Sequence, residues 1–332
     1  MKAREPLVQR VCRALGEGGF HSGQALAARF AVSRSAVWKA VGTLEQLGMQ
    51  VEAVRGRGYG LEQPLELLEA RTINALLPSS VRQQLRTGAV AWSIPSTNAA
   101  LMAATQPPPG QFDYLLAEHQ SAGRGRQARR WFAAPAGAIC LSVGYSFAAL
   151  PKQAGALSLA MGVCALRALR ELGPLPLALK WPNDLMANER KLGGILIELR
   201  AEAAGPAFVV IGIGLNCALG RLTTTRVRAS GTEACDLAGL GISAVPRNRL
   251  AAALIREIAL GAECFGREGF APFVAEWRAA DALSGRAVSL QGAGGVCVGH
   301  ARGISADGAL CVQTRDGLQQ FTSGDVSVRA TA

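Results

Sequence analysis

Apolar residues in the first sixty positions recur at the spacing of amphipathic helices. A first apolar stripe runs from Leu7 to Leu15 and stops at a cluster of glycines. Ser22 and Ser33 stand where the N-caps of two further helices are expected, the second after a tight connection. The residues VEAV then alternate as a strand, RGRGYG turns sharply, and a return strand begins at Tyr59. This order predicts three helices followed by a β-hairpin.

Two helices joined by a tight turn, with a basic hairpin after them, resemble a winged helix-turn-helix, which we place at residues 1–63. In that geometry the start of the third helix meets base edges, while arginines on the wing reach phosphates. A small helical docking domain with ordinary surface charge is the alternative interpretation. The residues predicted to contact DNA are Ser33, Arg34, Ser35, Trp38, Lys39, Arg55 and Arg57.

Residues 64–278 are dominated by strand-like runs, among them FDYLLAEHQ, KLGGILIEL and AFVVIGIGLNC. Helices are predicted at residues 153–172 and after Asn248 and Glu268. Strands joined by short turns, with helices to the side, indicate an α+β domain built on a mixed sheet. The uncharged run at residues 132–151 contains proline, glycine and serine, so we expect a buried pair of strands there and not a membrane span.

Residues 279–332 form short alternating runs separated by glycine turns, which is typical of a small SH3-like β-barrel. The dipeptides Asp307-Gly308 and Asp316-Gly317 are hairpin signals. The predicted inward positions are Val288, Leu290, Val296, Val298, Leu310, Val312, Val326 and Val328. The whole chain is therefore expected to be an α+β protein of three domains.

The amino-acid composition limits the class of protein and the kind of molecule that it binds. Of 332 residues, 49% are hydrophobic and 18% charged, which supports a sizeable core and excludes wholesale disorder. The formal net charge of +11 suits an anionic partner such as a nucleic acid or a nucleotide, although a basic solvated surface is the alternative. Eight cysteines lack any metal-ligand spacing, and the N-terminus has no signal-peptide pattern. We expect a cytoplasmic protein without a membrane partner.

The sharpest local signal is SAGRGRQARRW at residues 121–131. Its glycines let the backbone approach a ligand closely, and its four arginines supply guanidinium donors. Such a loop can hold a phosphate chain although the GxxxxGK[ST] pattern is absent. A mobile basic surface loop is the alternative.

A second constellation places cations beside a carboxylate. KWPNDL at residues 180–185 precedes KLGGILIE by a short turn, so a probable hairpin brings Lys180, Asn183 and Asp184 near Lys191. Cations offset charge on the α-phosphate of ATP, and a carboxylate can position a metal or an incoming amine. This mixture predicts an enzyme that activates a carboxylic acid as its adenylate. GIGLNC at residues 212–217 again allows close backbone approach.

The order and spacing of five motifs resemble those of the biotin protein ligases: PSTNAAL, EHQSAGRGRQARRW, KWPNDL, KLGGILIE and GIGLNC. With the N-terminal module, the chain resembles the bifunctional type, which is also the biotin operon repressor. The resemblance covers essentially the whole chain and implies a class II synthetase-like central domain. It implies catalytic roles for Lys191, Arg126 and Asp184. The implied biotin-binding residues are Ser96, Thr97, Asn98, Gln120, Arg124, Gly125, Arg126 and Lys191. The implied ATP and adenylate residues are Arg126, Lys180, Asn183, Lys191, Gly214 and Asn216.

The resemblance implies a two-step reaction. The biotin carboxylate attacks the α-phosphorus of ATP, with Mg²⁺ assisting, and biotinyl-5′-AMP then passes biotin to a lysine of the biotin carboxyl carrier protein of acetyl-CoA carboxylase. The adenylate-bound form would form a homodimer and bind operator DNA. A monofunctional ligase with a vestigial DNA-binding domain, a regulator that senses biotin without ligating it, and a lipoate ligase are alternatives. The sequence assigns neither metal ligands nor an operator.

Several positions allow two interpretations. Ser96 can cap a helix beginning at Asn98, Asp184 can bond its own turn, and Trp131 can be core or site, whereas Trp181 is expected in the core. Two features depart from the family pattern. Ala128 stands where a second glycine is usual, which predicts a stiffer loop. The stretch LGRLTTTRVRASGTEACDL at residues 219–237 is basic and has no aromatic residue, although in the family it orders over the adenylate.

Overall fold

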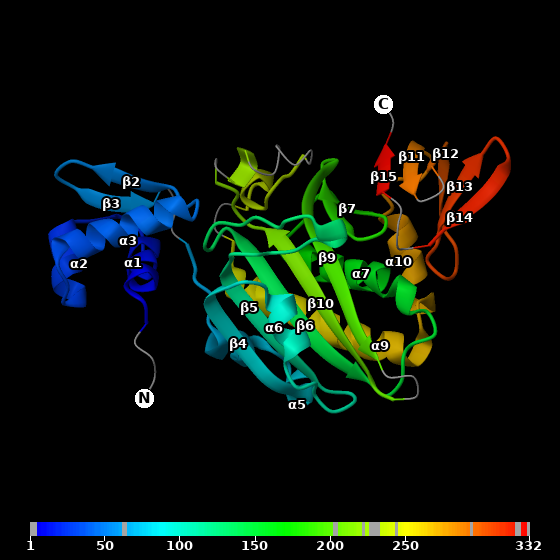
Figure 1. Ribbon diagram of the computed structural model, residues 1–332, viewed down its shortest axis with the longest axis horizontal. Helices are drawn as coiled ribbons and strands as arrows, with labels where there is room; N and C mark the ends of the chain where they lie inside the picture. Colours follow the sequence, from blue (N-terminus) through cyan, green and yellow to red (C-terminus); the bar gives the residue numbers. More distant parts are fainter. Residues whose placement is uncertain are drawn as a thin grey trace.

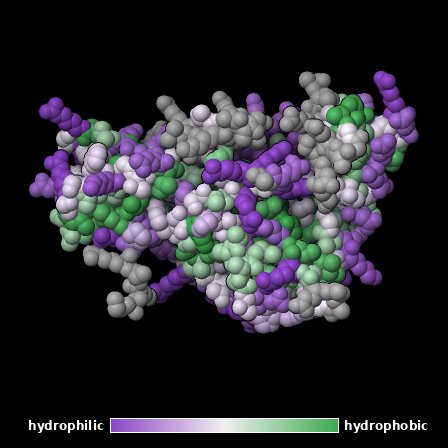
Figure 2. All heavy atoms as spheres, in the orientation of Figure 1, coloured by the Kyte–Doolittle hydropathy of each residue, from purple (hydrophilic) through white to green (hydrophobic). Residues whose placement is uncertain are grey.

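The structure is a computed structural model that describes residues 5–61, 65–201, 205–220, 223–225, 233–242, 245–292, 295–322 and 327–330. Three parts follow one another along the chain: a small helical part, a central sheet with helices on both faces, and a small C-terminal sheet (Figure 1). Within the described ranges, no helix has the length and apolar character needed to cross a bilayer. Hydrophilic side chains gather over the middle of the face shown in Figure 2.

The N-terminal part has the predicted order of three helices and a hairpin. Ser22 accepts a hydrogen bond from the Ala25 N–H at 3.0 Å, and Ser33 one from the Ala36 N–H at 3.1 Å, so both serines are N-caps. A short extra strand, which the sequence did not indicate, pairs with the hairpin in the order β1-β3-β2. The elements are α1 (Leu7–Gly16), β1 (Phe20–His21), α2 (Gly23–Phe30), α3 (Arg34–Gln46), β2 (Val51–Val54) and β3 (Gly58–Leu61). The winged helix-turn-helix prediction is confirmed.

The central part is built on a mixed seven-stranded sheet in the order β4-β5-β6-β10-β9-β8-β7. The pair β4–β5 is parallel, and the other neighbouring pairs are antiparallel. The strands are β4 (Leu85–Ile94), β5 (Phe112–Gln120), β6 (Ala138–Phe147), β7 (Leu177–Lys180), β8 (Asp184–Ala187), β9 (Arg190–Ala201) and β10 (Ala207–Asn216). The expected α+β domain is confirmed.

Helices cover both faces of this sheet (Figure 1). Apolar residues of the long helices α7 and α9 join the main core on one face, while α6 packs its Leu101 against Phe208 and Val210 on the other. The helices are α4 (Ala70–Leu76), α5 (Ser79–Gln84), α6 (Thr97–Ala103), α7 (Leu157–Arg170), α9 (Arg247–Glu268) and α10 (Val274–Ala279). Short 3₁₀ turns are η1 (Arg126–Ala128), η2 (Ala154–Ala156), η3 (Ala238–Leu240) and η4 (Ala271–Phe273).

Two expectations for the central part were wrong in detail. The run at residues 132–151 forms the single strand β6, buried at all ten positions, and not a pair of strands. It carries no charged residue because both faces of this central strand are covered. The helix expected from residue 153 begins at Leu157, since η2 precedes it.

The C-terminal part is a five-stranded antiparallel sheet in the order β14-β13-β12-β11-β15. Positive φ angles at Gly308 and Gly317 confirm both predicted turns. The strands are β11 (Ala287–Gly292), β12 (Gly295–Ile304), β13 (Leu310–Thr314), β14 (Gly317–Phe321) and β15 (Ser327–Ala330).

The inward positions were only partly predicted correctly. The buried side chains are those of Val288, Leu290, Leu310 and Val312. The expectation was wrong for Val296 and Val298, which are 65% and 60% exposed. They pair with Gln291 and Ser289, which alternate with the buried residues of β11, so the register turns them outward. Val326 and the side chain of Val328 lie outside what the structure describes.

Segment 65–69, which connects the N-terminal part to the sheet, is anchored by a buried ion pair. Arg247 at the start of α9 lies 2.8 Å from a carboxylate oxygen of Glu118 on β5, and both side chains are 3% exposed. Arg247 also donates to the carbonyls of Glu66 and Ala138, at 2.7 and 2.9 Å. The other Glu118 oxygen accepts a main-chain N–H of the segment at 2.5 Å.

Asn248 adds two further bonds to the same segment. Its amide donates to the Leu67 carbonyl at 3.0 Å and accepts from the Glu69 N–H at 2.8 Å. We call Glu118, Arg247 and Asn248 the linker clamp. It fixes the main chain of segment 65–69 on the central part by side chains that are themselves buried.

Glu118→Ala should lower the free energy of unfolding of the central domain by about 3–5 kcal/mol, because it leaves the Arg247 charge buried without its partner. Denaturant titration followed by circular dichroism measures the change. The matched control in the same domain is Glu268→Ala, which breaks the exposed Glu268–Arg267 pair and should cost far less, because solvent screens an exposed pair. Equal losses in the two variants would show that the clamp carries no special weight.

Candidate active site

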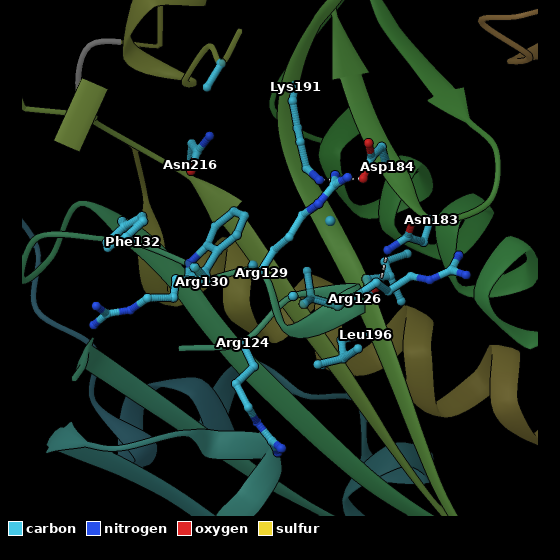
Figure 3. A pocket seen from close by; sticks show the side chains of 18 of the residues that line it. Arg124, Arg126, Arg129, Arg130, Phe132, Asn183, Asp184, Lys191, Leu196 and Asn216 are labelled. Carbon is cyan, nitrogen blue, oxygen red and sulfur yellow. Dashed lines mark hydrogen bonds and ion pairs between the residues drawn. The ribbon is translucent and has the colours of Figure 1, made fainter. Parts of the chain in front are cut away.

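A cavity of about 710 Å³ opens beside the central strands. Its lining comes from the start of α6, the loop at residues 121–131, the KWPND segment, and strands β9 and β10 (Figure 3). These are the segments that the sequence singled out. Every residue predicted to bind biotin or ATP lines this one cavity.

The start of α6 supplies a polar end to the cavity. Ser96 caps the helix, which begins at Thr97, so the capping interpretation is right although Ser96 also lines the cavity. The side-chain amide oxygen of Gln120 accepts from the Thr97 N–H at 2.7 Å and from the Thr97 hydroxyl at 3.1 Å. The Ser142 hydroxyl lies 2.7 Å from the Thr97 hydroxyl and 2.6 Å from the Asn98 carbonyl oxygen. Hydroxyls and amides therefore hold one another in fixed orientations.

Asn98 is locked from its other side as well. Its amide donates to a Glu198 carboxylate oxygen at 2.9 Å, and Glu198 also pairs with Arg124 at 3.0 Å. A Cβ at Gly212 would lie 2.2 Å from the Asn98 carbonyl oxygen, so only glycine leaves room for this side chain. Arg124 is thus held by a carboxylate, and in Figure 3 it extends away from Lys191.

The arginine-rich loop is folded back on itself. The Gly125 N–H donates to the Arg129 carbonyl at 2.7 Å, and the Trp131 N–H donates to the Gly123 carbonyl at 2.9 Å. Gln127 at the tip has a left-handed backbone, with φ of 53°. The prediction of a stiffer loop at Ala128 remains a prediction, because that side chain lies outside the described ones.

The side chains of the loop point in different directions. Arg126 lines the cavity from η1, and Arg129 extends toward the Lys191–Asp184 pair (Figure 3). The ring of Trp131 lies on Gly214, where an added Cβ would come within 2.6 Å of it. Trp131 is therefore a wall of the cavity.

The KWPND hairpin brings a cation and a carboxylate together as predicted. The Lys191 ammonium lies 2.5 Å from an Asp184 oxygen, and both side chains are about one quarter exposed (27% and 25%). Asp184 therefore bonds across the hairpin to Lys191. The Asn183 amide donates to the Ile195 carbonyl at 2.7 Å, which fixes the turn against β9. Lys180 lines the same side of the cavity.

Residues 233–235 close the site beside Lys191. The Lys191 N–H donates to the Glu233 carbonyl at 2.9 Å, and the Cys235 N–H donates to the Lys191 carbonyl at 3.0 Å. The buried amide of Asn216 donates to the Cys235 carbonyl at 3.0 Å. Within the stretch 219–237, residues 221–222 and 226–232 lie outside the described residues, so the expectation for its closure stays a prediction.

Residues outside the predicted biotin and ATP sets also line or support the cavity, among them Ser142, Glu198 and Arg129. A signal existed for each. Ser142 is a hydroxyl inside a buried apolar strand, which requires a hydrogen-bond partner. Glu198 ends the KLGGILIE motif, and Arg129 belongs to the arginine-rich loop. Among the described residues, no cluster of three His, Cys, Asp or Glu side chains could hold a metal.

The predicted DNA-contacting residues are all exposed. The first turns of α3 and the β2–β3 hairpin carry Ser33, Arg34, Ser35, Trp38, Lys39, Arg55 and Arg57. Trp38 is 65% exposed, which is high for so large an apolar side chain. The Ser33 hydroxyl is used as the N-cap, and the Arg57 guanidinium lies 4.1 Å from the ring centre of Phe20.

Three family models match the chain in the order of its three parts. They are an HTH domain at residues 10–60, the biotin/lipoate A/B protein ligase family at residues 90–216, and the biotin protein ligase C terminal domain at residues 283–329. Fold and site thus define a ligase of the biotin/lipoate class that carries a helix-turn-helix module.

Comparison with individual proteins narrows this class. The bifunctional ligase/repressor BirA of Escherichia coli is 36% identical over 321 residues, which are 95% of each chain. The chain therefore belongs to the BirA family, and it is a biotin protein ligase with an N-terminal helix-turn-helix. The biotin–[acetyl-CoA-carboxylase] ligase of Mycobacterium tuberculosis is 40% identical over 217 residues, 64% of this chain and 77% of that protein.

A solved structure agrees with this assignment. The biotin protein ligase of Aquifex aeolicus in complex with biotin and ATP superposes with a TM-score of 0.63 at 25% identity, over 74% of this chain and all of that one. The resemblance drawn from the motifs is confirmed, and with it the biotin–[acetyl-CoA-carboxylase] ligase activity.

Gly214→Ala should slow biotin-dependent ATP–pyrophosphate exchange by about ten- to a hundredfold, because the new Cβ displaces the Trp131 ring from the wall of the cavity. Stopped exchange assays with labelled pyrophosphate measure the rate. Adding Trp131→Leu to Gly214→Ala should restore part of it, since the smaller side chain leaves room. A double variant as slow as Gly214→Ala, with Trp131→Leu alone near normal, would show that the glycine acts by another route.

Proposed function

We propose that this cavity forms biotinyl-5′-AMP from biotin and ATP and transfers biotin to a lysine of biotin carboxyl carrier protein. The main observation in support is that one cavity has neutral polar side chains at one end and the Lys191–Asp184 ion pair at the other. A neutral, hydrogen-bonding end suits the ureido ring of biotin, and a cationic end suits phosphate. Domain boundaries near residues 63 and 278 are part of this proposal.

The biotin half consists of the α6 start and the segments facing it. Thr97, Asn98 and Gln120 are oriented by one another and by Ser142, so their remaining hydrogen-bonding capacity is preset before biotin arrives. Ser96 and Gly125 complete the proposed contacts, and Arg124 braces Asn98 through Glu198.

The nucleotide half lies on the opposite side, where the cations converge. Lys191 and Arg126 offset charge as the carboxylate attacks the α-phosphorus, and Lys180 extends the cationic surface. Asn183 and Asn216 hold the turns that carry these side chains, while Gly214 keeps the wall flat. In the second step the same cations stabilise AMP as the leaving group.

Magnesium fits this arrangement. Mg²⁺ is bound in nucleotide sites by one or two carboxylates together with substrate phosphates and water, so no three-ligand protein cluster is required. Asp184 supplies a carboxylate oxygen inside the cavity. When bound, the ion would neutralise phosphate charge, and Asp184 would hold it beside Lys191.

Lys191→Ala should slow biotin-dependent pyrophosphate exchange by about 10²-fold or more, because it removes the cation facing the developing charge. The exposed Lys152→Ala removes the same charge outside the cavity and should leave the rate unchanged. Circular dichroism checks that both variants are folded. A Lys191→Ala enzyme with normal exchange would remove this residue from the mechanism.

We propose further that the adenylate-bound form is a homodimer that represses biotin-synthesis genes by binding operator DNA in the cytoplasm. The exposed face of α3 and the basic hairpin support DNA binding, and the E. coli relative is named a bifunctional ligase/repressor. Strand β8 pairs with β9 only over residues 190–194, which leaves residues 197–201 as a described sheet edge for a second copy. A vestigial DNA-binding domain is the alternative.

Arg34→Ala should weaken binding to a palindromic operator by about tenfold or more while carrier biotinylation stays intact, because the first turn of α3 meets base edges. Gel-shift titrations with and without biotin and ATP, at two salt concentrations, measure it. Arg71→Ala removes an exposed charge from the central domain and is the control. Binding no tighter to biotin-gene DNA than to random duplex, by an adenylate-bound dimer, would favour the vestigial domain.

A further inference from the structure

The C-terminal sheet contains two Asp-Gly turns with different surroundings. Both glycines have positive φ angles, 81° at Gly308 and 114° at Gly317. At Gly317 an added Cβ would meet no atom within 4 Å. At Gly308 it would lie 2.8 Å from the Cβ of Ala156 and 2.9 Å from a methyl of Leu159. One turn is therefore seated on the central domain, and the other is open.

The seated turn is hydrogen-bonded to the central domain at two points. The Trp181 indole N–H donates to the Gly308 carbonyl at 3.0 Å, in a fully buried contact. Beside it, the Gln153 amide donates to an Asp307 carboxylate oxygen at 2.6 Å. Trp181 is 2% exposed, so its N–H depends on this partner from the C-terminal domain.

Trp181 stands inside the KWPND segment. Its neighbours Lys180, Asn183 and Asp184 line the nucleotide half of the cavity. The strand leading into the segment, β7, is also bound from the C-terminal side: the Leu179 N–H donates to the Ala280 carbonyl at 2.7 Å. The segment thus lies between the cavity and the C-terminal domain.

A second contact reaches the rim of the same half. Arg286, just before β11, forms an ion pair with Glu189, which lies in the β8–β9 turn and lines the cavity. Two separate points of the C-terminal domain therefore reach the two turns that carry the nucleotide-half residues.

We propose that the Asp307-Gly308 turn is a positioning element for the nucleotide half of the site, acting through Trp181. Gly308 is the positioning residue, because only glycine lets the turn approach closely enough for its carbonyl to meet the indole. The turn fixes the position of the KWPND segment relative to the cavity. It therefore fixes where Lys180 and Asp184 meet the phosphates. This inference rests on the proposed assignment of KWPND to the nucleotide half.

The test compares Gly308→Ala with its matched control Gly317→Ala. Both replace a glycine at positive φ, so both carry backbone strain, but only the first disturbs the seated turn. Gly308→Ala should raise the KM for ATP in biotin-dependent pyrophosphate exchange by about tenfold, because small displacements of positioning groups are costly. Binding of biotin alone, measured by calorimetry, should change by less than about twofold, since its contacts lie at the other end. Gly317→Ala should change neither quantity.

Trp181→Phe supplies an independent variant in case Gly308→Ala does not fold. It keeps an aromatic ring and removes the donor, so it should also raise the KM for ATP and spare biotin binding. Equal KM values for ATP in Gly308→Ala, Trp181→Phe and Gly317→Ala, with wild-type exchange intact, would overturn the inference and leave the proposed function standing. Weakened biotin binding with an unchanged KM for ATP would overturn the inference together with the assignment of the two halves.

Discussion

The site depends on glycines in the central sheet, which leave positions without a side chain. Strands β9 and β10 cross the middle of the domain, and their glycines leave the sheet bare where the cavity forms. The Asn98 side chain lies against Gly212, and the Trp131 ring lies against Gly214. In each case a Cβ on the glycine would overlap the neighbouring side chain. Gly194, which pairs with Gly214, lies under the Lys191 side chain. The proposed biotin side, the wall and the proposed nucleotide side therefore all require glycines in two adjacent strands.

Charge in the site is arranged in pairs that hold the two ends apart. Arg124 is paired with Glu198 on the side of Asn98, and Lys191 is paired with Asp184 on the side of KWPND. In each pair the carboxylate keeps its cation oriented within a partly solvated cavity. The first pair braces neutral hydrogen-bonding groups, whereas the second presents charge. The cavity thus changes along its length from neutral hydrogen-bonding groups to charged groups, which agrees with the proposed order of biotin and nucleotide.

The sequence predicted those features that local patterns encode. The caps Ser22 and Ser33, the central strands from β5 onward and the proximity of Lys191 to Asp184 follow from spacing and from a short hairpin. Strand β4 was not predicted. Features set by distant contacts could not be found this way. Strand β4 pairs in parallel with β5 across a connection, and Val296 and Val298 face outward because of their register with β11. Alternation in one strand cannot show which of its two faces turns toward the core.

Distant contacts also explain what the motifs left out. Ser142 and Glu198 support Asn98 from strands that are far from it in the chain, at 2.6 and 2.9 Å. Trp181 was expected in the core, and it is buried there. The partner of its indole N–H, 127 positions further along, comes from another domain. Pattern identifies the kind of residue a site needs, and tertiary structure decides which residues orient it.

The linker clamp fixes residues 65–69, which follow the winged helix along the chain, on the central domain. A free segment of five residues would let the winged helix sample many orientations, each carrying an entropic cost when DNA selects one of them. Glu118, Arg247 and Asn248 hold the segment on the central domain, and Arg13 of α1 forms an ion pair with Glu69 of the same segment at 2.8 Å. These contacts narrow the range of orientations in the folded monomer. In a two-fold assembly the separation of the two α3 helices is then set by the protein. The protein therefore sets the spacing of the two DNA half-sites that it accepts, and an operator with a base pair added or removed between them does not fit this spacing.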